Sequence, residues 1–340
     1  MKLIKTVDAV GHVLCHDITQ IIPGKTKGPI FRKGHVVTEE DIPVLLSVGK
    51  DHLYIWEMDD NMLHENDAAA VLYSICKNDH MSGTTPTEGK IELIADLDGL
   101  FKVDVEKLNR INALGEIIIS TRHSNFAVKK GDKLAGTRII PLVIRRERLE
   151  DAKRIAGDEP LFRLLPFGHK KAAIVTTGNE VFYGRIKDAF GPVIRQKLSE
   201  FDVDVIGQTI INDEQDKITS IIKDYIEKGA DFILCTGGMS VDPDDTTPSA
   251  IKGTGARLVT YGAPVLPGAM FLLAYYGEQN IPIVGLPGCV MYSKRTIFDL
   301  VLPRIMAGEI LAAEDLSVLG HGGLCLSCPE CVFPNCGFGK

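Results

Sequence analysis

Features that mark several protein classes are absent from this chain of 340 residues. No apolar run approaches the roughly 18 residues that a membrane-spanning helix needs. The amino-terminal stretch MKLIKTVDAVGHV lacks the apolar segment and cleavage site of a secretory leader. The net charge of −7 argues against a general nucleic-acid-binding protein, which carries an excess of basic residues. We therefore expect a cytoplasmic protein that binds neither a membrane nor nucleic acid.

Signatures of familiar nucleotide and hydrolase sites are also missing. The chain has no P-loop, G-x-G-x-x-G or G-x-S-x-G pattern, which disfavours ordinary nucleotide kinases, dehydrogenases and serine hydrolases. Its composition is that of a globular protein, with 45% hydrophobic and 24% charged residues. The length allows two domains, because single domains usually have about 100–200 residues.

Hydrophobic periodicity separates two regions and a tail. Residues 1–165 contain β-branched and apolar runs, which predict a separate, β-rich α+β domain or domains with strands at 53–56, 116–120 and 137–144. In residues 166–312 strands and helices alternate, which predicts an α/β domain with a doubly wound, mostly parallel sheet. Residues 313–340 form a cysteine-rich tail.

The stretch 230–251 carries the strongest functional signal. The apolar run 232–235 is typical of a buried parallel strand, and Gly237 and Gly238 end it. Two glycines at a strand's carboxyl end let the backbone approach a ligand, and Ser240 adds a hydroxyl. A solvated surface loop is the plain alternative for such a sequence.

An acidic group follows the two glycines. Asp242, Asp244 and Asp245 place three carboxylates within four positions. Because like charges repel, a divalent cation is expected to offset them, and Mg²⁺ is the ion that accepts few carboxylates together with substrate phosphates.

Three loops leave the carboxyl ends of predicted parallel strands and should border one crevice. They comprise residues 177–180, residues 237–245 and residues 285–288. Ser293 is expected just inside the helix that follows, where a hydroxyl suits phosphate. The predicted ligand-binding residues are Thr177, Gly178, Asn179, Glu180, Gly237, Gly238, Ser240, Pro287, Gly288 and Ser293.

Together these motifs resemble a known family. TTGNE at 176–180, TGGMSVDPDD at 236–245, Pro267-Gly268 and GLPG at 285–288 are similar in order and spacing to the molybdopterin-binding domain of molybdenum cofactor biosynthesis proteins, over about residues 170–308. The resemblance implies a three-layer α/β fold that binds molybdopterin, or its adenylylated form, by phosphate at Gly237, Gly238 and Ser240. It also implies a homodimer or homotrimer.

The resemblance leaves the role open among three alternatives. Gly-Gly-Met-Ser resembles the molybdenumtransferase branch, which inserts molybdate, or tungstate, and releases AMP, with Asp245 and Asp242 as catalytic and cation-binding residues. Asn179 stands where that branch has Asp, and its Asp-Gly-Tyr-Ala signature is absent, which favours a carrier that hands cofactor to an apo-molybdoenzyme. A nucleotide pyrophosphohydrolase, as in competence-damage-inducible relatives, is the third alternative.

The tail contains the densest cysteine group of the chain. Cys325, Cys328, Cys331 and Cys336 form a C-x2-C-x2-C-x4-C run. Four thiolates this close predict a metal centre, either an iron–sulfur cluster or tetrahedral Zn²⁺, with redox thiols as a further alternative. We favour the cluster slightly, because two successive C-x2-C steps are typical of iron–sulfur ligation.

Overall fold

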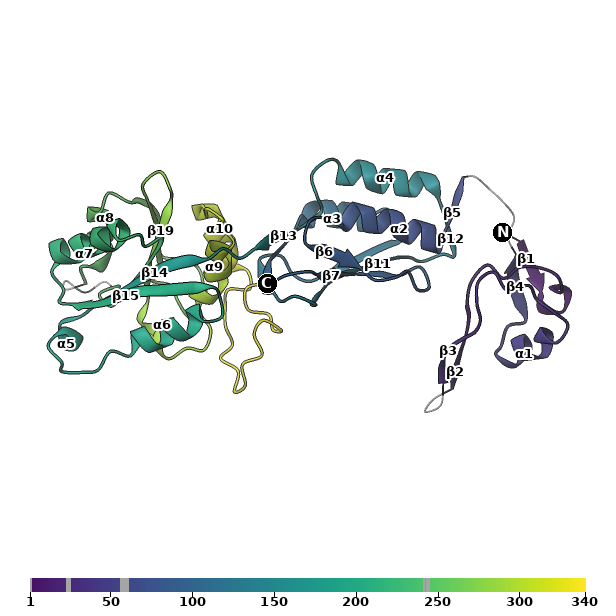
Figure 1. Ribbon diagram of the computed structural model, residues 1–340, viewed down its shortest axis with the longest axis horizontal. Helices are drawn as coiled ribbons and strands as arrows, with labels where there is room; N and C mark the ends of the chain where they lie inside the picture. Colours follow the sequence, from purple (N-terminus) through teal and green to yellow (C-terminus); the bar gives the residue numbers. More distant parts are fainter. Residues whose placement is uncertain (1, 23–25, 56–60, 241, 243–244) are drawn as a thin grey trace. The chain divides into compact units, whose positions relative to one another are not determined.

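The computed structural model describes residues 2–22, 26–55, 61–240, 242 and 245–340 (Figure 1). It divides into two compact units, which are described separately. The first comprises Met1–Asp96, Asp104–Arg122 and Gly131–Arg163, and the second comprises Leu97–Val103, His123–Lys130 and Leu164–Lys340. In the described ranges, no helix combines the length and the apolar character needed to cross a membrane.

The first unit starts with short strands and helices that pack around an apolar cluster containing Leu14, Leu45 and Leu53. β1 pairs antiparallel with β4, and β2 pairs antiparallel with β3. Trp56, at the end of the predicted strand 53–56, lies outside the described residues. The elements are β1 (Lys2–Lys5), η1 (Thr6–Asp8), β2 (Ile18–Ile22), β3 (Thr26–Phe31), α1 (Asp41–Ser47) and β4 (His52–Ile55).

The rest of the first unit is an antiparallel sheet with helices on one face, as Figure 1 shows for α2, α3 and α4. The strand order is β6-β7-β11-β9, and β5 pairs separately with β12. The prediction of a β-rich mixed region is thus confirmed. The elements are β5 (Met62–His64), α2 (Glu65–Cys76), β6 (Met81–Gly83), β7 (Ile91–Ala95), α3 (Val105–Asn112), β9 (Ile117–Thr121), β11 (Lys133–Ile139), β12 (Val143–Arg145) and α4 (Arg146–Ala156).

A six-stranded sheet in the order β15-β14-β16-β19-β18-β17 forms the centre of the second unit. The first four strands are parallel, β18 is antiparallel to β19, and β17 is antiparallel to β18 and so runs in the direction of the first four, so the predicted mostly parallel sheet is confirmed. The strands are β14 (Lys170–Thr177), β15 (Val203–Ile211), β16 (Phe232–Thr236), β17 (Arg257–Tyr261), β18 (Leu272–Tyr276) and β19 (Ile281–Leu286).

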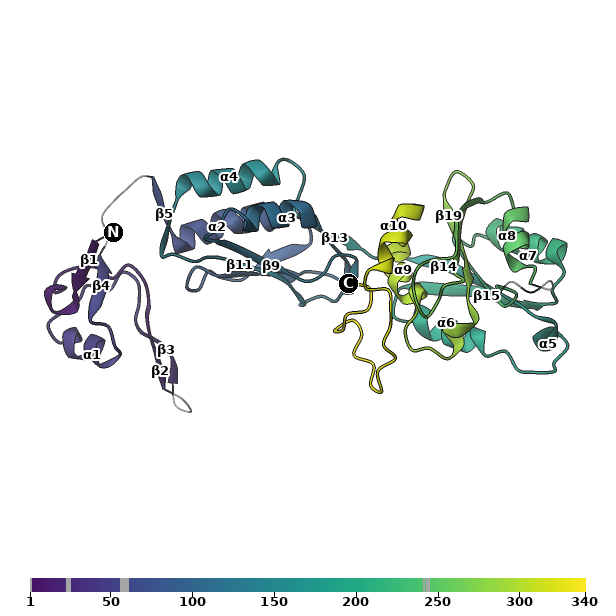
Figure 2. The same cartoon turned by 180° about the vertical axis from the view of Figure 1, so that it is seen from behind.

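Helices cover both faces of this sheet (Figure 2). Because successive side chains of a strand point to opposite faces, Ile174 packs with α6 and α9 while its neighbour Val175 packs with α7 and α8. The central strands β16 and β19 are accordingly buried at every residue, whereas the edge strands β15 and β17 are partly exposed and carry polar residues. The helices are α5 (Asn179–Phe182), α6 (Phe190–Leu198), α7 (Gln215–Glu227), α8 (Thr247–Gly253) and α9 (Ile297–Met306), with the 3-10 turn η2 (Gly288–Met291) before α9.

Smaller elements complete the second unit. A three-stranded sheet has the order β10-β8-β13, with β8 (Gly99–Val103), β10 (Phe126–Val128) and β13 (Phe162–Pro166). The chain then passes through α10 (Ala313–Ser317) and η3 (Val318–Gly320) into residues 325–340, which form neither helix nor strand.

Candidate functional site

The turn after β16 requires two glycines. Gly237 has a φ of +82° and Gly238 a φ of +53°, in the left-handed region that side chains disfavour. A Cβ at Gly237 would overlap the backbone carbonyl oxygen of Thr177, and one at Gly238 would lie 2.9 Å from Oγ1 of Thr247. The backbone can therefore line a ligand site here without side chains that would fill it.

A pocket of about 490 Å³ opens at this turn. It brings together two of the three loops that sequence analysis predicted to converge, those at 237–245 and 285–288. The segment after Pro267-Gly268 completes the wall through Ala269 and Met270. The pocket-lining residues that were predicted from the sequence are Gly237, Gly238, Ser240, Asp242, Asp245, Pro287 and Gly288.

The third predicted loop supports the turn from behind. Oγ1 of Thr177 lies 2.9 Å from Oγ1 of Thr247, so β14 is tied to the first turn of α8 next to Gly238. Gly178, Asn179 and Glu180 follow in the chain, and the last two begin α5. Residues 177–180 are not among the residues that line this pocket, and of these four Thr177 contacts the turn.

Asp213 is a site residue that sequence analysis missed. Its Oδ2 accepts a hydrogen bond of 2.9 Å from the backbone amide of Asn179, while Oδ1 is buried with no hydrogen-bond partner among the residues that the structure describes. Burial raises the pKa of Asp213, the Asn179 amide opposes this, and the charges of Glu180 and Asp245 raise the pKa further. The sequence could have indicated this residue, because Asp213 closely follows β15, a parallel strand.

Tyr261 at the end of β17 is a second residue that was missed. Its hydroxyl lies 3.0 Å from the carbonyl oxygen of Met239 and 3.1 Å from that of Ser240. Burial, together with the charge of Asp245, raises the pKa of Tyr261, so the phenol remains a donor. The ring therefore holds the loop that leaves the glycine turn.

Asp242 and Asp245, the two described residues of the acidic group, are joined by two hydrogen bonds in a turn. The amide of Asp245 donates to the carbonyl oxygen of Asp242 at 3.0 Å, and the amide of Asp242 donates to Oδ2 of Asp245 at 3.3 Å. Asp244 lies outside the described residues. Among those that are described, no three His, Cys, Asp or Glu side chains are placed to hold one metal ion.

Ser293 lies elsewhere than predicted. The prediction that it lies just inside a helix is wrong, because η2 ends at Met291 and α9 begins at Ile297. The N-cap of α9 is Thr296, which forms a reciprocal capping box with Asp299. Ser293 lines two cavities beside the tail and α6, but it is not among the residues that line the glycine-turn pocket.

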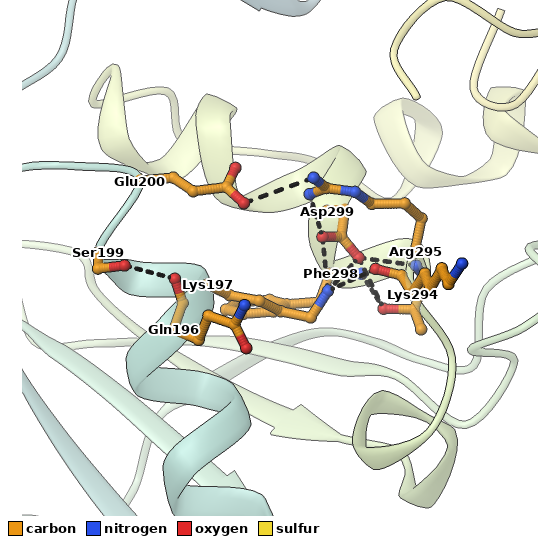
Figure 3. A network of polar contacts seen from close by, with 9 residues as sticks. Gln196, Lys197, Ser199, Glu200, Lys294, Arg295, Phe298 and Asp299 are labelled. Carbon is orange, nitrogen blue, oxygen red and sulfur yellow. Dashed lines mark hydrogen bonds and ion pairs between the residues drawn. The ribbon is translucent and has the colours of Figure 1, made fainter. Parts of the chain in front are cut away.

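A buried ionic network fixes the segment between η2 and α9 (Figure 3). Nζ of Lys197, from α6, lies 2.7 and 2.8 Å from the two carboxylate oxygens of Asp299 and 3.1 Å from the carbonyl oxygen of Lys294. Arg295 contacts Asp299 at 2.9 Å and Glu200 at 3.4 Å. A buried charge is tolerated only with partners of this quality, so the network holds the chain that follows the Pro287-Gly288 loop.

The four tail cysteines are free thiols in this structure. Cys325 and Cys336 are partly buried, and Cys328 and Cys331 are exposed. Neither they nor other ligand types within the described ranges form a group of three that could hold a single metal ion.

Comparisons with known proteins show which families and relatives this chain is similar to. The model of a family described as "Probable molybdopterin binding domain" matches residues 173–307, and that of a domain of unknown function matches residues 3–57. A CinA-like protein of Mycobacterium avium is 36% identical over 95 residues, which are 28% of this chain and 22% of that protein. A molybdopterin molybdenumtransferase of Synechococcus elongatus is 23% identical over 159 residues, which are 44% of this chain and 38% of that protein.

This chain therefore spans only about a fifth to two fifths of these two curated relatives. Among solved structures, the molybdopterin biosynthesis enzyme MoaB of Thermus thermophilus matches 41% of this chain and 98% of its own. The sequence identity is 21% and the TM-score is 0.34.

Proposed function

Since residues 173–307 belong to the probable molybdopterin-binding domain family, as the motifs predicted, we propose that the glycine-turn pocket binds molybdopterin or its adenylylated form. The observation that carries the proposal is the turn at Gly237 and Gly238, where a Cβ would meet neighbouring atoms and the backbone itself lines the pocket. Backbone amides of such a turn can donate to phosphate oxygens, and Ser240 adds a hydroxyl. The residues present thus fit a phosphate-bearing ligand.

The surrounding residues keep this pocket in shape. Tyr261 holds the carbonyl groups of Met239 and Ser240, and the Thr177–Thr247 contact ties the turn to β14. Met270, Met291 and Tyr292 supply apolar surface on which a pterin ring can lie. The pocket therefore combines a polar end for phosphate with an apolar wall.

Binding, rather than metal insertion, is the role that these residues support best. Asn179 cannot act as a charged metal ligand, and burial raises the pKa of Asp213, which accepts a hydrogen bond from the Asn179 amide. We place a carrier that passes molybdopterin-type cofactor to an apo-molybdoenzyme first. Insertion of molybdate or tungstate with release of AMP comes second, because Asp245 and Asp242 do line the pocket.

Calorimetric titration of the full chain with molybdopterin tests the binding proposal. Release of the fluorescent oxidised pterin then measures how much cofactor the chain holds. We expect saturable binding that the Ser240→Ala variant weakens by about threefold to tenfold, since a hydrogen bond to a charged group is worth about 1.5 kcal/mol or somewhat less in a wet site. A chain that carries no pterin after expression and binds none in titration would contradict the proposal.

Turnover assays separate the three roles. Adenylylated molybdopterin with molybdate or tungstate reports AMP release by an inserting enzyme, and ADP-ribose with a divalent cation reports pyrophosphohydrolysis. We expect neither activity above background from a chain that binds pterin. If the parent chain releases AMP, and Asp245→Asn abolishes that release but retains pterin binding, the transferase role would replace the proposed carrier role.

A further inference from the structure

All four tail cysteines line one cavity of about 620 Å³. Its wall comes from the tail on one side and from Pro267 and residues 292–295 on the other. The spacing of the cysteines in the sequence, C-x2-C-x2-C-x4-C, therefore places all four residues around one open cavity. This cavity is a second candidate ligand site in the unit, with a lining different from that of the glycine-turn pocket.

The tail is attached to the domain on both sides of the cysteine run. Leu324 forms a parallel bridge with Leu266, through hydrogen bonds of 2.8 Å from the Leu266 amide to the Gly323 carbonyl oxygen and from the Cys325 amide to the Leu266 carbonyl oxygen. At the other end the Gly339 amide donates to the Gly322 carbonyl oxygen at 2.9 Å, and Phe338 is buried in the domain core. The cysteines thus lie in a closed loop with fixed ends.

Positive side chains border the cavity. Arg295 lies over the ring of Phe333 with its guanidinium carbon 5.0 Å from the ring centroid, and Nζ of Lys294 lies 3.5 Å from the carbonyl oxygen of Pro329. Both residues belong to the segment that the Lys197–Asp299 network fixes. Their charges would offset part of the negative charge of four thiolates at one centre.

A cluster and a single ion require different separations between the thiolates. Four thiolates on zinc converge on one atom at about 2.3 Å, whereas the irons and bridging sulfides of a cluster keep the ligating thiolates apart. In the described part of the chain, no three candidate side chains converge closely enough for one ion, yet the four thiols share one cavity.

We propose that Cys325, Cys328, Cys331 and Cys336 bind one iron–sulfur cluster in this cavity. Each thiol releases a proton as its sulfur bonds to iron, and the assembled cluster supplies the inorganic sulfide. The proposal does not depend on pterin binding, so each of the two can fail alone.

Anaerobic expression and purification of the full chain tests this inference. Iron and acid-labile sulfide are measured, together with the visible absorption and the electron paramagnetic resonance spectrum before and after dithionite. We expect iron and sulfide in equal amounts and a broad visible absorption. In the Cys328→Ala/Cys331→Ala variant both should fall to background, because an all-cysteine cluster is lost when two of its ligands are missing.

A matched control is Cys76→Ala, which removes a thiol that is buried in α2 of the first unit. It should keep the full iron and sulfide content. Stoichiometric zinc without iron would overturn the cluster, and so would a chain that takes up no iron after anaerobic reconstitution with iron and sulfide. A tail variant with the same iron content as the parent chain would also overturn the cluster. Circular dichroism shows whether the tail variant has folded.

Discussion

The glycine-turn pocket and the tail cavity lie in the same unit but are built in different ways. Loops at the carboxyl edge of a six-stranded sheet form the first, and buried side chains hold it in place. A segment without helix or strand forms much of the second. We infer that the pocket keeps its shape when empty, whereas the tail needs its ligand to be equally well ordered. Rigid elements preorganise a site, and a loop becomes ordered when it binds.

The two sites share one wall, the segment from η2 to α9. Tyr292, of which 78% is exposed, lines both, and Lys294 and Arg295 continue the wall toward the tail. The Lys197–Asp299 network holds this segment in the core. Changes to the network should therefore affect both sites, and changes elsewhere should affect only one.

The largest effect is expected from Asp299→Ala, which should damage both sites. It leaves Lys197 buried without its carboxylate, and it removes the acceptor of the Thr296 amide at 2.7 Å. Losing one partner of a buried pair costs about 3–5 kcal/mol. Urea denaturation should show the free energy of unfolding falling by that amount. The exposed Asp224→Ala in α7 is the control and should change it by less than about 0.5 kcal/mol.

Gly237→Ala should impair the glycine-turn pocket alone. The positive φ costs a side chain about 1–2 kcal/mol, and the overlap with the Thr177 carbonyl would move the turn. Calorimetric titration should show pterin affinity reduced at least about tenfold, which corresponds to about 1.4 kcal/mol. Gly229→Ala has a similar φ of +90° with open space around it, so it should lower stability without changing affinity. Equal affinities in the two variants would contradict the proposed role of the turn.

The tail double variant Cys328→Ala/Cys331→Ala should have a smaller effect on global stability. Both side chains are exposed, so the free energy of unfolding of the domain should change by less than about 1 kcal/mol. Hydrogen exchange should nevertheless be faster in residues 326–336, between the two anchored ends of the tail, while β14 and β16 keep their protection. Unchanged protection in the tail would mean that this segment is ordered without a cluster.

The smallest effect is expected from Asp213→Asn, measured as a pH dependence. The pKa of Asp213 is raised in the folded state, so the native chain binds more protons there than the unfolded chain does. Stability is therefore lost as pH rises from the unfolded pKa of about 3.9 through the folded pKa. The variant should be more stable than the parent at pH 7, and the two should converge near pH 3. A parent that is more stable at neutral pH would show that burial does not control this group.

Strand positions could be predicted from the sequence because their signal is local. Strand β16 begins where the apolar run 232–235 predicts it, and the two glycines at 237–238 stand where the backbone requires them. Parallel strands also imply that their carboxyl-end loops converge. Ser293 was misplaced although the sequence held the answer, since Thr296 and Asp299 have the spacing of a capping box.

Other features depend on contacts that a sequence does not show. Tyr261 reaches the glycine loop only because the antiparallel strand β17 lies at the edge of the sheet, and nothing in its local sequence indicates that contact. The cysteine spacing predicts a metal centre, but it does not reveal that Pro267 and Arg295 form the opposite wall. The contact of Thr177 with Thr247 behind the turn likewise follows from packing.

The bridge between Leu266 and Leu324 connects the segments that line the two candidate sites. Leu266 is continuous with Ala269 and Met270, which line the glycine-turn pocket, and its amide and carbonyl are bonded to the tail. If cluster binding restrains this segment, it changes pterin affinity by some factor, and pterin must then change cluster affinity by the same factor, because coupling between two binding sites is reciprocal. If the coupling is favourable, a pterin-loaded chain binds its cluster more tightly than an empty chain does.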